Sequence, residues 1–215
     1  MNLSVSAAIR NFGDVAKKAC MAELVQLFKE KKALVAVHLE DLTEEQRRNV
    51  IRSHMFLTKK FEDGKFVKMK GRVVADGRMQ DRTVYSDYSA PTAKTRSVMT
   101  CLKLAAVKGW DLLKLDVGGA FLCAPIGEEE VFMSLDRELT EKAVECMPEL
   151  KSFVLDGKLI VKVEKAMYGL IQSAKLWYDE LTRYLGTQGF KKSSLDECVL
   201  VKKMDNGRYI VVYFM

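Results

Sequence analysis

A tight turn between two strand-like runs most constrains the fold of this chain. Residues 56–61 and 65–74 are rich in aromatic and β-branched side chains, and Asp63-Gly64 lies between them. An Asp-Gly pair readily adopts the positive φ angles that a two-residue hairpin turn needs. The sequence therefore predicts an antiparallel hairpin, and with it a sheet whose apolar face other elements must cover.

The rest of the chain alternates between helical and strand patterns. We expect helices over residues 14–31, 43–53, 95–108 and 173–185, with end signals at Asp14, Thr43 with Gln46, and Gly109. We expect further strands over residues 110–116, 131–135, 158–164, 198–204 and 209–214, and a loop over residues 76–91. Because strands and helices do not alternate regularly, the sequence favours an α+β fold over a doubly wound sheet.

Helical spacing predicts which faces of these helices are buried. The apolar stripes are Cys20, Leu24, Leu27 and Phe28 in the first helix, Val98, Leu102 and Ala105 in the third, and Trp177, Leu181 and Tyr184 in the last. The acidic stretch over residues 136–156 has no clear pattern.

Composition narrows the class of protein. With 215 residues and 48% hydrophobic content, the chain can bury a core and is not wholly disordered. The net charge of +6 favours a polyanionic partner, although many basic proteins bind no nucleic acid. Five scattered cysteines and two histidines argue against a zinc site or a disulfide framework. We see no secretory signal and no membrane-spanning run, and we expect an intracellular protein, cytoplasmic or nuclear.

The second strand of the hairpin carries a row of cations. Alternation places Lys68, Lys70 and Arg72 on one face and Val67, Met69 and Val73 on the other. Adjacent like charges repel, and a bound polyanion would relieve that cost. Taken alone, an ordinary solvated strand face is the more common explanation.

An acidic residue ends the apolar run at residues 110–115. Asp116 is followed by Gly118 and Gly119, which leave space beside its carboxylate, and then by Phe121. Such a carboxylate can bind a metal, but an acid at a strand end is more often a turn residue.

A third segment, residues 165–173, joins a strand to a helix. Gly169 permits a close backbone approach, and Gln172 and Ser173 offer polar groups near the helix start. The simpler interpretation is an ordinary connection in which Ser173 caps the helix.

Taken in order, these segments resemble the reverse transcriptase domain of copia-type retrotransposon polyproteins. The resemblance covers about residues 22–215 and rests on four motifs. They are KGRVVADG at residues 70–77, YSAPTAK at residues 88–94, DVGGAFL at residues 116–122, and KAMYGLIQSAKLW at residues 165–177.

The resemblance implies a right-hand polymerase, of which the chain covers the fingers and part of the palm. Residues 1–54 would form a helical lead-in, residues 55–109 the fingers with the basic hairpin, and residues 110–215 an incomplete palm. The implied activity is RNA-directed DNA synthesis, with an RNA or DNA template-primer and a deoxynucleoside triphosphate (dNTP) as partners.

The resemblance also implies a role for each motif residue. Asp116, with the Val117 carbonyl, would bind the first of two Mg²⁺ ions. Lys70 and Arg72 would hold the triphosphate of the dNTP. Phe121 would pack under the sugar and reject a 2′-hydroxyl, and Tyr168 and Gly169 would line the nucleotide pocket.

Several positions depart from the family pattern. Ile171 and Ala174 replace a lysine and a proline, Asp76 replaces a basic residue, and Gly118-Gly119 replaces bulkier polar residues. The paired aspartates of the family's Y-V-D-D motif do not follow Tyr213. One carboxylate cannot hold two Mg²⁺ ions, so we expect an inactive fragment that lacks the rest of the palm and the thumb.

Three hypotheses follow for the present role of the chain. It is a reverse transcriptase fragment, a non-enzymatic nucleic-acid-binding protein derived from a retrotransposon, or a relic with an exposed strand edge. The sequence supports the first as ancestry and does not choose among the three as present role.

Overall fold

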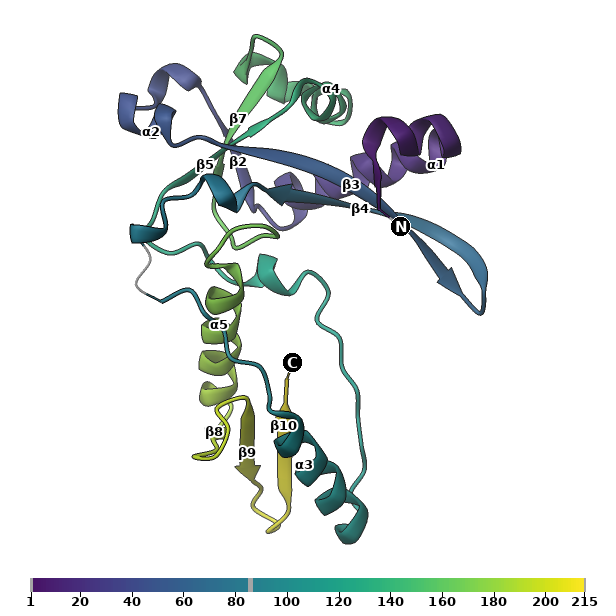
Figure 1. Cartoon of the computed structure of the whole chain (residues 1–215), viewed down its shortest axis with the longest axis vertical. Coiled ribbons are helices and arrows are strands. Elements are labelled where there is room, and N and C mark those ends of the chain that lie inside the picture. Colours follow the sequence, from purple (N-terminus) through teal and green to yellow (C-terminus); the bar gives the residue numbers. More distant parts are fainter. Residues whose placement is uncertain (1, 85–86, 215) are drawn as a thin grey trace.

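The described residues form a mixed α/β structure of two mainly antiparallel sheets and five α-helices. Figure 1 shows this structure, a computed structural model that describes residues 2–84 and 87–214. Residues 85–86 of the expected loop, and Met215 after Tyr213-Phe214, lie outside the described residues. The larger sheet has seven strands and the smaller sheet has three. The mixed composition agrees with the expected fold class.

The larger sheet draws its strands from widely separated parts of the chain. Its hydrogen-bonded order is β1-β3-β5-β7-β2, with β4 paired to β3 and β6 paired to β7. These strands are β1 (Asn2–Ser4), β2 (Leu34–Val37), β3 (Ile51–Glu62), β4 (Lys65–Ala75), β5 (Val131–Leu135), β6 (Val154–Leu155) and β7 (Lys158–Val163). The first strand and β2 therefore place the N-terminal segment within the same sheet as the hairpin.

The predicted hairpin is confirmed and is longer than expected. β3 pairs antiparallel with β4 around the Asp63-Gly64 turn, and the pairing runs from Glu62 opposite Lys65 to Ser53 opposite Ala75. Its outer end extends beyond the core, as Figure 1 shows. Val67, which shares its face of the strand with the buried Met69 and Val73, is consequently 47% exposed.

The first helix starts earlier than predicted. α1 (Val5–Val25) is capped by Ser4, whose hydroxyl accepts a hydrogen bond from the Ala7 amide at 3.3 Å. The expected start at Asp14 was wrong. Asp14 lies directly after a kink at Gly13 (φ 50°, ψ −127°) inside the helix, and the helix itself begins at Val5. A π-helical turn (Gln26–Glu30) continues α1.

Short helices and 3-10 turns connect the strands of the larger sheet. They are a 3-10 turn (Leu39–Asp41), α2 (Glu44–Arg48), 3-10 turns at Gly77–Met79 and Arg82–Val84, α4 (Arg137–Cys146) and a 3-10 helix (Pro148–Phe153). The Thr43/Gln46 capping box of α2 is confirmed, with both of its hydrogen bonds present. The acidic stretch without a clear pattern forms α4, whose N-cap is Asp136.

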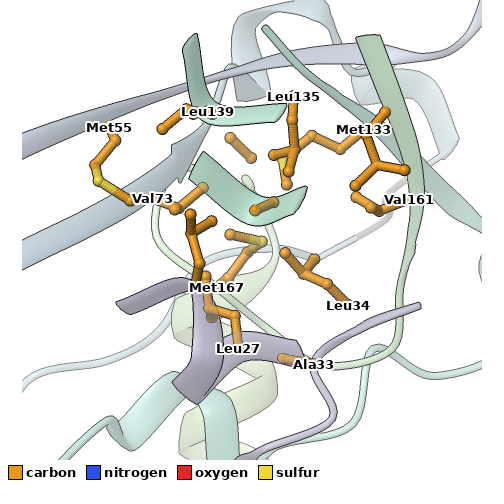
Figure 2. Packing of buried hydrophobic residues seen from close by; sticks show 14 of the residues in the cluster. Leu27, Ala33, Leu34, Met55, Val73, Met133, Leu135, Leu139, Val161 and Met167 are labelled. Carbon is orange, nitrogen blue, oxygen red and sulfur yellow. The ribbon is translucent and has the colours of Figure 1, made fainter. Parts of the chain in front are cut away.

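The core lies between the larger sheet and the helices α1 and α4. Figure 2 shows its centre, where Leu27, Met55, Val73, Leu135 and Met167 converge from five different segments. Three members of the predicted α1 stripe, Cys20, Leu24 and Leu27, are at most 2% exposed. Burial of this apolar surface is the main stabilising contribution to the fold.

The smaller sheet contacts α5, where the Tyr178 hydroxyl accepts a hydrogen bond from Lys192 of the sheet. Its strands β8 (Lys191–Lys192), β9 (Val199–Lys203) and β10 (Tyr209–Tyr213) form the order β10-β9-β8. The predicted α3 (Thr95–Lys108) is confirmed, and Gly109 ends it in the left-handed conformation. α5 (Ser173–Thr187) is also confirmed. No helix in the part of the chain that the structure describes is long and apolar enough to cross a membrane.

The buried face of α5 differs from the predicted one. Tyr184 is 56% exposed, whereas Tyr178 is 5% exposed. The Tyr178 hydroxyl can be buried because it donates a hydrogen bond to the Glu197 carboxylate at 3.1 Å and accepts one from Lys192 at 2.9 Å. Apolar spacing alone could not reveal these polar partners.

The apolar run before Asp116 is not a buried strand, and that prediction was wrong. The run belongs to an extended, unpaired segment that leads from the end of α3 to a 3-10 helix at Ala120–Cys123, along one side of the structure in Figure 1. Leu112, Leu113 and Leu115 are 68%, 83% and 79% exposed. Strand-forming side chains do not make a strand unless a partner satisfies the backbone, and no strand among the described residues pairs with this segment.

Candidate active site

The two predicted phosphate-binding cations project from the solvent-facing side of β4. Met69, Gly71 and Val73 point into the core, so alternation turns Lys70 and Arg72 outward. Lys70 is exposed, and Arg72 is half-buried beside the next part of the site. The predicted separation of these side chains onto two faces is confirmed.

Three of the predicted site residues form one cluster. The Arg72 guanidinium carbon lies 5.5 Å from the centre of the Tyr168 ring. The Tyr168 and Phe121 rings meet edge to face, with centroids 5.1 Å apart. Each contact is favourable, because a cation is attracted to an aromatic face and ring edges are attracted to ring faces. We call these three residues the Arg72–Tyr168–Phe121 cluster.

Backbone pairing next to the 3-10 helix at Ala120–Cys123 brings Phe121 to this cluster. Leu122 is 8% exposed and belongs to the core. The Ala166 amide donates to the Ala124 carbonyl at 2.9 Å, and Pro125 forms a bridge with Lys165. Phe121 is therefore held beside the segment that carries Tyr168.

Residues 167–172, which we call the Tyr168 turn, dock on the edge of β4 that does not pair with β3. The Ala75 amide donates to the Tyr168 carbonyl at 2.8 Å. Gly169 has a φ of +94°, and a Cβ at this position would collide with the Ala75 carbonyl oxygen. A glycine is thus required by backbone conformation and by space.

Ser173 does not cap α5 as predicted. Its hydroxyl accepts a hydrogen bond from the Met167 amide at 3.0 Å and also donates to the Met167 carbonyl. Gln172 occupies the N-cap position without a side-chain cap. Ser173 therefore closes the turn that presents Tyr168.

Glu23 of α1 is a charged neighbour of the site that the sequence analysis missed. α1 approaches β4 at Gly71, where an added Cβ would lie 3.0 Å from the Ala19 carbonyl oxygen. The Glu23 carboxylate accepts a hydrogen bond from the Val73 amide at 3.4 Å. Burial raises the pKa of the Glu23 carboxyl, and the Val73 amide, Lys70 and Arg72 oppose this only in part. In the sequence, Glu23 is a charged residue on the apolar stripe of α1, between Cys20 and Leu27, and this position could have indicated that it is partly buried.

Asp76, which replaces a basic residue of the family pattern, forms ion pairs next to the cluster. Its carboxylate accepts hydrogen bonds from Arg78 at 2.8 and 3.0 Å, and Arg52 lies 3.9 Å away. These hydrogen bonds from Arg78 lower the pKa of the Asp76 carboxyl. The negative charge that Asp76 brings to this position is therefore neutralised by the neighbouring arginines Arg78 and Arg52.

Asp116 and Val117 do not belong to a cluster of acidic side chains among the described residues. Both are exposed in the unpaired segment, and the Asp116 side chain makes no hydrogen bond or ion pair with any described residue. Within residues 2–84 and 87–214, no group of three or more His, Cys, Asp or Glu side chains could hold a metal ion. The donor set does not fit a two-metal centre, because Mg²⁺ needs several oxygen ligands in octahedral geometry.

Comparison with protein families identifies the chain. A model of the reverse transcriptase (RNA-dependent DNA polymerase) family matches residues 37–215. The chain therefore belongs to the reverse transcriptase family. No solved structure matches it significantly.

The curated relatives are copia-type retrotransposon polyproteins. The chain is 30% identical over 161 residues to the retrovirus-related Pol polyprotein from transposon TNT 1-94 of Nicotiana tabacum, covering 74% of this chain and 11% of the relative. It is 32% identical over 169 residues to the polyprotein from transposon RE2 of Arabidopsis thaliana, covering 76% and 11%. A Ty1-DR4 Gag-Pol polyprotein of Saccharomyces cerevisiae is 31% identical over 176 residues, covering 76% and 10%. The chain thus spans about a tenth of these relatives' length.

Proposed function

We propose that this chain forms the nucleotide-holding part of a copia-type reverse transcriptase. The observation that carries the proposal is the Arg72–Tyr168–Phe121 cluster, since three segments far apart in the sequence meet there. Arg72 and Lys70 would grip the triphosphate of an incoming dNTP, because charge-assisted hydrogen bonds to phosphate are strong. Phe121 would contact the sugar, and Tyr168 with Gly169 the base.

The domain assignment is part of the same proposal. Residues 55–109, which hold α3 and all but the first residues of the hairpin, would be the fingers, and residues 110–215 would contribute to the palm. The lead-in at residues 1–54 would support both through β1, α1 and β2. An RNA or DNA template-primer would bind across the basic strands, where Lys60 lies opposite Lys68.

Asp116 and the Val117 carbonyl would be the metal-binding positions of this site. Divalent ions would supply charge stabilisation for nucleotidyl transfer in the family. Because Asp116 has no acidic cluster around it among the described residues, we derive no metal-dependent step from this chain. What its own residues would do is bind and orient the triphosphate.

A non-enzymatic nucleic-acid-binding role is the second candidate. The observation favouring it is the exposed end of the hairpin, where Phe61 and Phe66 are 57% and 43% exposed among lysines. Aromatic rings beside cations are suited to stacking on unpaired bases. Such a protein would bind nucleic acid without binding dATP.

Removing the Arg72 guanidinium tests the proposed function. We expect Arg72→Ala to weaken binding of a fluorescent dATP analogue by about 10- to 100-fold, the equivalent of one lost charge-assisted hydrogen bond. Arg78→Ala is the matched control, because Arg78 is a neighbouring arginine whose side chain is 86% exposed and paired with Asp76. Equal affinities of Arg72→Ala and the unaltered chain would refute the assignment. Binding of a primer–template without any dATP binding would favour the second candidate.

A further inference from the structure

The segment after β4 and the Tyr168 turn face each other through their backbones. The Ala75 amide bonds to the Tyr168 carbonyl at 2.8 Å. A Cβ on Gly77 would collide with the Gly169 carbonyl oxygen, and a Cβ on Gly169 would collide with the Ala75 carbonyl oxygen. At this point the two segments are too close for a side chain to lie between them, so a side chain that joins them must reach across from beside the contact.

Gln80 supplies that group from the end of the same segment. Its Oε1 accepts a hydrogen bond from the Ile171 amide at 3.0 Å. Its Nε2 donates to Oε1 of Gln172 at 3.1 Å. The orientation of the Gln80 amide is determined, because the Ile171 amide can only donate. Gln172 is 4% exposed, so water cannot readily replace this hydrogen bond.

The hydrogen bonds of Gln80 hold the turn that presents Tyr168. The backbone N–H of Gln80 donates to the Gly77 carbonyl at 3.2 Å, which fixes Gln80 relative to the glycine contact. Tyr168 itself is 42% exposed, so burial alone does not fix the position of its ring. Its position between Arg72 and Phe121 therefore depends on the backbone of the turn.

We propose that Gln80 is a positioning residue that fastens the Tyr168 turn to the segment after β4 and so assembles the Arg72–Tyr168–Phe121 cluster. The functional part of this inference rests on the proposed nucleotide site. Gln80 acts through the turn, because the hydrogen bonds described above reach Ile171 and Gln172 and not the clustered side chains. Its loss would misplace Tyr168 without removing any group that contacts the nucleotide.

The position of Tyr168 can be read directly by ¹⁹F NMR of the full chain labelled with 3-fluorotyrosine. The resonance of Tyr168 is assigned by its loss in Tyr168→Phe. We expect Gln80→Leu, which keeps side-chain bulk and removes the hydrogen bonds to Ile171 and Gln172, to move this resonance toward that of a freely exposed tyrosine. Gln188→Leu is the matched control, because Gln188 is exposed and lies beyond the end of α5. We expect it to leave the resonance in place.

A second variant and a binding measurement also test the positioning role of Gln80. If Gln80→Leu does not fold, Gln80→Glu retains an acceptor for the Ile171 amide, and we expect a smaller shift of the same resonance. An unchanged Tyr168 resonance in whichever variant folds would overturn the positioning role. In the folded variant we also expect dATP affinity to fall about fivefold. A shifted resonance in a chain that binds no dATP even without substitution would support the positioning role and refute the proposed function.

Discussion

Replacing Gly169 by alanine is expected to cost about 2–5 kcal/mol of unfolding free energy, the sum of a left-handed backbone penalty and a steric clash. Gly169 has a φ of +94°, and the added methyl would overlap the Ala75 carbonyl oxygen and lie 2.7 Å from Cγ1 of Val74. Backbone cannot move aside as a flexible side chain can. The substitution therefore either separates the Tyr168 turn from β4 or destabilises the whole protein. Urea unfolding measures the loss of unfolding free energy.

Gly189→Ala provides the matched control for this substitution. Gly189 has a φ of +84°, but the nearest atom to an added Cβ is the flexible Lys202 Cε at 3.7 Å. We therefore expect only the backbone penalty, about 1–2 kcal/mol. Equal losses for the two variants would show that the Tyr168 turn does not dock tightly on β4.

A second large effect is expected in the core and not in the apolar run before Asp116. Leu135→Ala removes a fully buried side chain shown in Figure 2 and is expected to cost about 2–5 kcal/mol. Leu113→Ala makes the same chemical change at a residue that is 83% exposed, and we expect a change within about 0.5 kcal/mol. The two variants differ only in the environment of the leucine.

The leucine pair also tests the correction made to the sequence-based prediction. If residues 110–115 were a buried strand, Leu113→Ala would destabilise the chain by several kcal/mol. A loss for Leu113→Ala as large as that for Leu135→Ala would therefore restore the buried strand. Thermal unfolding monitored by circular dichroism is sufficient to separate the two outcomes.

Local signals explain which elements could be predicted. The Asp63-Gly64 turn, the Thr43/Gln46 capping box and the Gly109 cap act within a few residues, and the structure confirms all three. The apolar run at residues 110–115 failed as a strand because pairing requires a partner, which local sequence does not specify.

The sequence predicted the residues that form the candidate site better than the residues that hold them in place. Motif resemblance singled out Arg72, Phe121 and Tyr168, which the structure brings together. Gln80 escaped notice because its partner Ile171 lies 91 positions along the chain, and no local pattern encodes that pairing. Asp116 was singled out by the same resemblance, yet it lies in the exposed segment, and residues 2–84 and 87–214 place no cluster of three or more metal-binding side chains there.

Primer extension tests most directly whether a nucleotide-holding cluster exists here without an assembled metal centre. A polypeptide of these 215 residues is incubated with Mg²⁺, a primed RNA template and a labelled dNTP that can also be photocrosslinked. We predict crosslinking of the dNTP that depends on Arg72, and no lengthening of the primer. Primer lengthening that is abolished in Asp116→Asn would contradict this, because it would require a functional metal centre around Asp116.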